Sequence, residues 1–183
     1  MLLLVILSSS LACTLLDGQD PTNPKPSLTK CYRYNTSACC VSAHDSSIQD
    51  TYGSFLSSQC QREYDILEDY FCFGCNPNQS DHTDEENKVI RICEGYAKSL
   101  WGGDLLRPTR NFDNCGITTY WRDENDRITI VPSSEWANAY QFFWEVKPPF
   151  FEDYSIYIVN DESDEDCYSF GLVLMFAIGF LVI

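Results

Sequence analysis

The sequence is poor in histidine and in basic side chains, and each shortage excludes a class of function. Its two histidines, His44 and His82, both stand among polar neighbours, and a structural or catalytic zinc site needs more ligands at suitable spacing. We therefore expect no metal site. Twelve Lys and Arg stand against 27 Asp and Glu, giving a formal net charge of −15. Nucleic-acid partners are excluded, because their binding depends on neutralising phosphates.

Recognisable catalytic motifs are also missing. The chain has no glycine-rich phosphate loop and no nucleophile elbow. Cys72 and Cys75 have the spacing of a redox motif, but no thioredoxin-like βαβ pattern surrounds them. Carboxylates are so numerous that their pairing carries no information. We therefore expect a protein that is not an enzyme and that needs no cofactor.

Long hydrophobic runs are confined to the two ends of the chain. Residues 1–7 are apolar and small residues follow up to Ala12, which is typical of a secretory signal peptide. We assign residues 1–18 to this signal, with cleavage between Ala12 and Gly18. A buried N-terminal strand or a short anchor is the alternative interpretation.

The C-terminal run, residues 168–183, is apolar to its last residue. It is shorter than the roughly 20 residues that span a bilayer, and no basic residues follow it. A polar spacer and small residues precede it, as in the signal for a glycosylphosphatidylinositol (GPI) anchor. We assign residues 161–183 to this signal and expect the lipid at Asp161, with Ser163 as the second choice. A short tail anchor or membrane helix is the alternative. The expected location is the outer cell surface.

Cysteine is abundant, with ten in 183 residues. Removal of both signals would take Cys13 and Cys167 away, and in an oxidising compartment the remaining eight are expected in disulfides. These eight are Cys31, Cys39, Cys40, Cys60, Cys72, Cys75, Cys93 and Cys115. Adjacent Cys39 and Cys40 should reach different partners, because a bond between them would be strained. If cleavage falls directly after Ala12, Cys13 stays and one thiol is left over.

Between the signals the length fits one domain. Residues 19–30 are rich in proline and are interpreted as a linker, and residues 31–160 as the extracellular domain. Asn35 and Asn78 begin Asn-x-Ser/Thr sequons, which predict glycosylated, exposed loops in a secreted protein.

Hydrophobic periodicity predicts helices in the first half of this domain and strands in the second. Residues 48–71 have apolar residues at helical spacing, with a bend or break near Gly53 and Cys60. A capping box at Thr83–Glu86 predicts a second helix, whose apolar face runs from 89 to 101. The other predicted elements are a hairpin of residues 117–121 and 128–131, a short aromatic helix within 134–144, and a last strand at 155–159.

The order and spacing of cysteines over residues 31–101 carry a resemblance. Cys31 precedes Cys39-Cys40 by eight residues, and then follow Phe55-Leu-Ser57 with Cys60, and Phe71-Cys-x-x-Cys75-Asn-Pro. This layout resembles the folate receptor-like family, which includes folate receptors and egg riboflavin-binding proteins. It is also similar to the N-terminal sterol-binding domain of the Niemann-Pick cholesterol transporter.

The resemblance implies a disulfide-rich α+β fold, mainly helical around one pocket, with short β strands. It implies the pairs Cys31–Cys72 and Cys40–Cys75, and an upstream partner for Cys39 that Cys13 alone could supply. Cys60 would pair with Cys115. This assignment leaves Cys93 without a partner.

The resemblance also implies a function. The chain lacks the Trp-rich, cysteine-spaced segment of folate receptors, so folate specificity is not carried over. We expect a surface receptor or carrier for a small vitamin-like (folate, flavin) or sterol-like ligand, bound in an aromatic pocket. The candidate ligand-binding residues are Tyr52, Phe55, Trp101, Arg107 and Arg110. The aromatic stripe can equally be plain core, and the two arginines plain surface charges. The alternative function is protein–protein recognition or adhesion on the same scaffold with the pocket lost.

Overall fold

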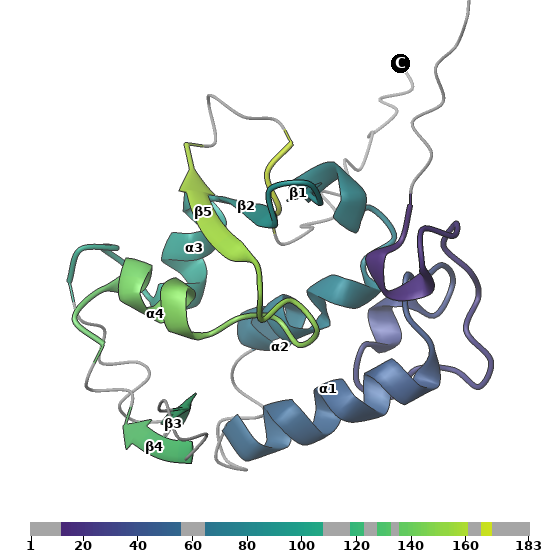
Figure 1. Ribbon diagram of the computed structural model, residues 1–183, viewed down its shortest axis with the longest axis horizontal. Coiled ribbons are helices and arrows are strands. Elements are labelled where there is room, and N and C mark those ends of the chain that lie inside the picture. The colour runs from purple at the N-terminus through teal and green to yellow at the C-terminus, as the bar shows by residue number, and fades with distance from the viewer. Residues whose placement is uncertain are drawn as a thin grey trace, which may run out of the picture.

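The computed structural model of the chain has an α+β fold. It describes residues 12–55, 65–107, 136–160 and 166–169, together with the backbone of two strands at 118–122 and 128–132. The described helices are α1 (Ser42–Phe55), α2 (Asp65–Phe71), α3 (Glu94–Trp101) and α4 (Ala139–Glu145). In Figure 1 α1 runs along one side of the molecule, the sheet that contains β2 lies on the opposite side, and α2 and α3 lie between them.

Helix α1 begins at Ser42, ahead of the predicted range, and buries Ile48, Tyr52 and Phe55 along one face. It continues through Gly53 without a break. Helix α2 runs directly into a 3-10 turn, η4 (Cys72–Cys75), whose four residues are all buried. The helical prediction for residues 48–71 therefore holds at both ends, while residues 56–64, including Cys60, lie outside the described part of the chain.

The helix predicted to start at the capping box is wrong in its first half. Thr83–Asp84 and Val89–Cys93 form antiparallel strands β1 and β2, and the helix α3 begins only at Glu94. Val89, Ile90 and Ile92 are β-branched residues that suit a strand, and β2 pairs along its whole length with a strand far along the chain. Tertiary pairing therefore outweighs the local helix signal.

That distant strand is β5 (Ser155–Val159), which coincides with the predicted last strand. It pairs parallel to β2, from Val89 opposite Ser155 to Cys93 opposite Val159, and gives the sheet order β1-β2-β5. The predicted hairpin is also confirmed. Strands β3 (Thr118–Arg122) and β4 (Ile128–Pro132) pair antiparallel in a separate two-stranded sheet.

The aromatic helix is shorter than predicted. Helix α4 begins at Ala139, after Asn138 caps it by accepting a hydrogen bond of 2.9 Å from the Gln141 N–H. Trp136 is buried ahead of the helix, Phe142 and Phe143 form its buried face, and Tyr140 points outward with about half of its surface exposed. Tyr140 therefore does not share the buried environment of Trp136 and Phe143.

The core is strongly aromatic. Rings from every described helix meet in edge-to-face and tilted contacts, with centroids about 5–6 Å apart, the usual geometry for such pairs. The largest fully buried side chains are Trp101, Trp136, Tyr52, Tyr70, Tyr168, Phe71, Phe73, Phe142, Phe143, Phe151 and Ile48.

Four disulfides join the described cysteines. Cys31–Cys72 and Cys40–Cys75 are the pairs that the resemblance implies, and Cys39 bonds to the upstream Cys13. The fourth disulfide joins Cys93 to Cys167. Cys60 and Cys115 lie outside the described residues.

Two of these disulfides use cysteines from the terminal segments that are expected to be removed. Cys13 belongs to the expected signal 1–18, and Cys167 to the expected anchor signal 161–183. A mature chain that keeps these disulfides begins at or before Cys13 and extends to Cys167 or beyond. Cys93, which the implied pairing left alone, then has its partner.

The proline-rich stretch 19–30 packs as part of the domain and is not a free linker. Thr22 forms two backbone hydrogen bonds with Ala38, and Leu28 is buried in the core. The buried carboxylate of Asp45 in α1 accepts hydrogen bonds from the N–H groups of Thr29, Lys30 and Cys31, at 2.6–3.2 Å. This carboxylate ties the end of the stretch to the start of α1.

Candidate functional site

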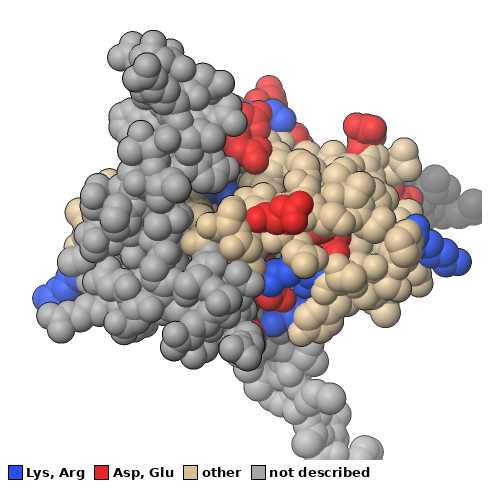
Figure 2. Space-filling model, turned by 90° about the horizontal axis from the view of Figure 1, so that it is seen from below, with Lys and Arg blue, Asp and Glu red and all other residues tan. Residues whose placement is uncertain are grey.

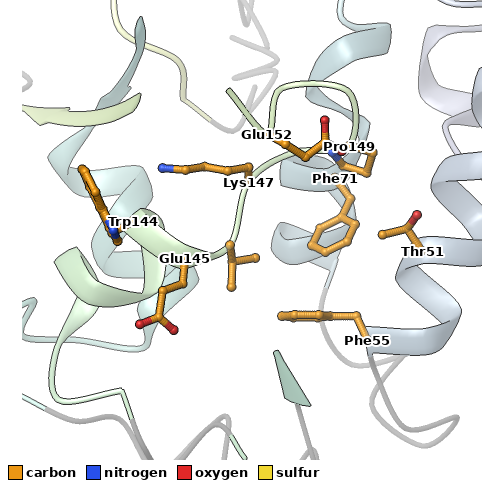
Figure 3. A pocket seen from close by; sticks show the side chains of 9 residues that line it. Thr51, Phe55, Phe71, Trp144, Glu145, Lys147, Pro149 and Glu152 are labelled. Carbon is orange, nitrogen blue, oxygen red and sulfur yellow. The ribbon is translucent and has the colours of Figure 1, made fainter. Parts of the chain in front are cut away.

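A cleft of about 160 Å³ opens between α1 and α2 on one side and the end of α4 with the following loop on the other. Figure 3 shows the side chains around it. Phe55 ends α1, Phe71 ends α2, and Pro148-Pro149 turns the chain away from α4. Three helix ends therefore meet at one place and leave a gap between them. Its lining residues are Thr51, Phe55, Phe71, Trp144, Glu145, Val146, Lys147, Pro149 and Glu152.

The inner part of the cleft is apolar. The rings of Phe55 and Phe71 lie 5.3 Å apart between centroids and face the gap from the α1–α2 side. Val146 and Pro149, both buried, add aliphatic surface from the α4 side. Phe55 also packs against the buried Trp136 and is itself only 6 % exposed. This packing holds the apolar part of the cleft firmly in place.

Lys147 supplies a cationic group at the edge of the cleft. Its Nζ donates a hydrogen bond of 2.7 Å to the carbonyl of Phe143, which leaves two of its N–H groups for other acceptors. In Figure 3 its side chain runs along the α4 side toward Trp144, and Nζ lies 5.5 Å from the centre of that ring. Burial lowers the pKa of Lys147 to about 8. None of the ion pairs described in the structure involves it.

The two carboxylates of the cleft are occupied elsewhere. Glu145 accepts hydrogen bonds from the Trp136 indole at 2.7 Å and from Gln141 at 3.1 Å. Glu152 accepts one of 3.1 Å from the backbone N–H of Phe150. Neither carboxylate forms an ion pair with Lys147 among the described contacts, so its remaining N–H groups are available to an acceptor that enters the cleft.

The structure separates the predicted ligand-binding residues. Phe55 lines the cleft. Tyr52 and Trp101 are core side chains and do not line the cleft. The ring centre of Tyr52 lies 3.7 Å from Lys30 Nζ, and the indole N–H of Trp101 donates a hydrogen bond of 2.8 Å to the Arg107 carbonyl. Arg107 is exposed and pairs with Asp104 at 3.3 Å, and Arg110 lies outside the described residues.

Lys147 and Trp144 were missed by the sequence interpretation. Trp144 is the last residue of the predicted aromatic helix, and Lys147 precedes Pro148-Pro149 in a stretch without a recognised motif. The available signal was a lone lysine between an aromatic run and two prolines. The burial that lowers the pKa of Lys147 arises only when the chain is folded, and no local pattern reveals it.

The two sequons differ in their surroundings. The Asn35 side chain is half buried, accepting from the Leu28 N–H at 2.6 Å and donating to the Leu28 carbonyl at 3.1 Å. Asn78 is exposed, and none of the described hydrogen bonds involves its side chain. Asp161, the expected lipid site, lies outside the described residues.

The surface adds no strongly charged binding region on the face shown in Figure 2. The described residues there are mostly uncharged, and acidic and basic side chains are scattered rather than gathered into a patch of one sign. Within the described ranges, no group of His, Cys, Asp and Glu has the geometry to hold a metal ion. Of the helices that the structure describes, none has both the length and the apolar character needed to cross a membrane.

No protein-family model matches the sequence, and no curated protein matches it either.

Proposed function

We propose that the protein is an extracellular receptor or carrier that binds a small, acceptor-bearing aromatic ligand in the cleft between α1, α2 and α4. The observation that carries this proposal is the combination of an apolar interior with the half-buried ammonium of Lys147, which takes part in none of the described ion pairs. Ligand sites are typically apolar concavities with a few converging polar groups. The four described disulfides are compatible with an oxidising, extracellular setting.

The size of the cleft favours a planar vitamin-like ligand over a sterol. About 160 Å³ is below the roughly 300–1,000 Å³ of sites that enclose a drug-sized molecule. One ring fits between Phe55, Phe71 and Val146, while the rest of the molecule stays outside against the exposed Trp144. A planar, vitamin-like ligand such as a pterin or flavin meets this description better than a sterol, which needs a longer enclosed cavity.

The ammonium of Lys147 determines which polar groups the ligand is expected to carry. An ammonium in an apolar setting is stabilised by a carboxylate, a phosphate or a ring carbonyl placed within hydrogen-bond reach. The indole of Trp144, 73 % exposed, offers a stacking surface beside it. We therefore expect an anionic or strongly accepting edge on the ligand.

A thermal-shift screen tests this function directly. The oxidised full chain, purified in mild detergent, is heated with pterins, flavins and sterols, each with and without a carboxylate or phosphate. A ligand at about 100 times its Kd adds roughly 2.7 kcal/mol to the free energy of unfolding. A planar anionic compound should stabilise the protein, and no shift from any class would contradict the proposal.

Two lysine variants make the test specific to the cleft. Lys147→Met keeps the aliphatic stem and removes the charge, so the ligand-induced shift should disappear. Lys98→Met is the matched control, because Lys98 lies on α3, pairs with Glu94 at 2.6 Å and does not line the cleft. Equal losses in both variants would count against the assigned site.

Recognition of another protein is the second candidate. Tyr140 and Trp144 stand one helical turn apart on α4 and are 51 % and 73 % exposed, and both residue types are enriched at interface hot spots. Tyr140 does not line the cleft. Loss of cell or protein binding in Tyr140→Ser, with small-ligand binding unchanged, would favour this function.

A further inference from the structure

The segment Asp166–Ser169 is built into the fold, although the sequence places it within a signal expected to be removed. Tyr168 is 2 % exposed and Cys167 is nearly as buried. Cys167 is bonded to Cys93 with a Cα–Cα distance of 5.0 Å. Loss of this segment would therefore free a buried thiol and open the core.

Backbone pairing holds the same segment at the edge of the sheet. Strand β1 pairs only with Val89 and Ile90 of β2. Farther along the same edge of β2, the pairing partner is Tyr168. Its N–H donates to the Arg91 carbonyl at 2.9 Å, and its carbonyl accepts from the Cys93 N–H at 2.9 Å. Without it, two backbone groups in a buried part of β2 would lose their partners, which is costly.

The side chain of Tyr168 completes a buried cluster. Its hydroxyl donates to Asp69 at 2.5 Å, and its ring packs against Phe73 and Tyr96 at 5.1 and 5.2 Å. His82 Nδ1 lies 2.8 Å from the carbonyl oxygen of Asp166. The disulfide, the backbone hydrogen bonds and these side-chain contacts together fix a stretch of four residues.

A GPI signal requires a polar spacer between the attachment residue and the apolar tail, and this spacer leaves with the tail. Here the spacer after Asp161 contains the buried, cross-linked element. Attachment at Asp161 or Ser163 would discard Cys167 and Tyr168 together. The folded structure and this processing step exclude each other.

We propose that the mature protein keeps Asp166–Ser169 and the apolar run Phe170–Ile183, and that this run holds the domain directly against a lipid bilayer. The run begins one residue after the last described residue, Ser169. The cross-linked Cys167 stands only three positions before this run begins. This inference concerns membrane attachment and goes beyond ligand binding, which is tested separately.

The test uses the full chain expressed on secretory cells. Membranes are treated with a phosphatidylinositol-specific phospholipase C, and the protein is then extracted with detergent. We expect no release by the enzyme and full recovery in detergent. Digestion without reduction, followed by mass spectrometry, should yield a peptide containing Cys93 joined to one containing Cys167. Release by the phospholipase, or a mature chain that ends before Cys167, would overturn the proposal.

A variant pair keeps the test informative if cross-link variants fold poorly. Asp161→Leu with Ser163→Leu replaces both expected attachment residues by bulky ones that GPI transfer rejects, and it leaves every described contact untouched. The membrane-bound amount should equal that of the unaltered chain. Loss of membrane binding in this double variant would show that one of these residues carries a lipid. Ligand binding should be unchanged in either case.

Discussion

The hydroxyl of Tyr168 donates a hydrogen bond of 2.5 Å to Oδ2 of Asp69, a residue 99 positions earlier in the chain. Asp69 also lies 3.3 Å from the hydroxyl of Tyr34 and 3.5 Å from that of Tyr96. Burial raises the pKa of Asp69, although these hydroxyls and the charge of Arg33 act in the opposite direction. The C-terminal segment thus supplies the shortest contact to a buried carboxylate.

Tyr168→Phe should therefore lower the free energy of unfolding. It removes a donor from a buried acceptor and leaves the ring in place, a change that costs about 1–3 kcal/mol. Urea denaturation without reductant measures it. Tyr157→Phe is the control, because Tyr157 is 57 % exposed on β5 and should change stability little. Equal effects in the two variants would contradict the assigned role of the Tyr168 hydroxyl.

Asp45→Asn should make the stability of the protein depend less on pH in the acid range. Burial alone would raise the pKa of Asp45, but N–H donors from Cys31, Lys30 and Thr29 outweigh it and lower the pKa. A lowered pKa stabilises the fold above the pKa of the unfolded chain, and this contribution is lost as pH falls through the folded value. The variant should lose about 2 kcal/mol at neutral pH and show a flatter acid limb in denaturation measured against pH.

The matching variant is Asp69→Asn. The pKa shift of Asp69 is opposite in direction to that of Asp45, so its effect on stability against pH is also opposite. Since the pKa of Asp69 is raised in the folded protein, its contribution falls as pH rises through that value. The two variants should therefore alter the pH profile in opposite directions. Parallel changes would show that one of the two shifts has been assigned the wrong direction.

Binding of an anionic ligand should weaken as pH rises through 8. Burial lowers the pKa of Lys147 to about 8, so the ammonium needed by the ligand is progressively lost there. Titration calorimetry on either side of this pH measures the effect. Lys147→Arg should keep binding and abolish the alkaline decline, because guanidinium stays protonated. A decline that persists in the Arg variant would place the titrating group elsewhere.

Glycan should be found on Asn78 and not on Asn35. The amide of Asn35 is engaged on both of its polar atoms by Leu28, and a sugar on Nδ2 would crowd this half-buried contact. The exposed side chain of Asn78 has no such constraint. Asn78→Gln should remove the mass shift caused by peptide N-glycosidase F. Asn35→Gln should leave that shift intact but lower the melting temperature.

The elements that follow from local sequence were predictable. The hairpin strands and β5 are short β-rich runs bounded by polar residues or turns, and α1 and α2 carry clear helical spacing. Residues 89–93 were not, because their state depends on pairing with Ser155–Val159 far along the chain. A capping box describes a helix start only if the following residues are free to continue the helix.

Only the parts of the candidate site that depend on local sequence patterns were predictable. Phe55 follows from the aromatic stripe of α1, and Cys31–Cys72 and Cys40–Cys75 from the spacing shared with the resembling family. The role of Lys147 depends on which distant side chains bury it. The bond between Cys93 and Cys167 depends on a C-terminal stretch whose composition resembles a discarded spacer.

The Cys93–Cys167 bond also decides how the domain would respond to tension. A pull from the C-terminal end reaches Cys167 first and passes through sulfur into Cys93, where β2 meets α3. Strand β5 and the loop after α4, which borders the cleft, lie inside the covalent ring that this bond closes and are bypassed. Tension applied between the C-terminal end and a point ahead of Cys93 would therefore bypass these segments until β2 itself separates from its neighbours.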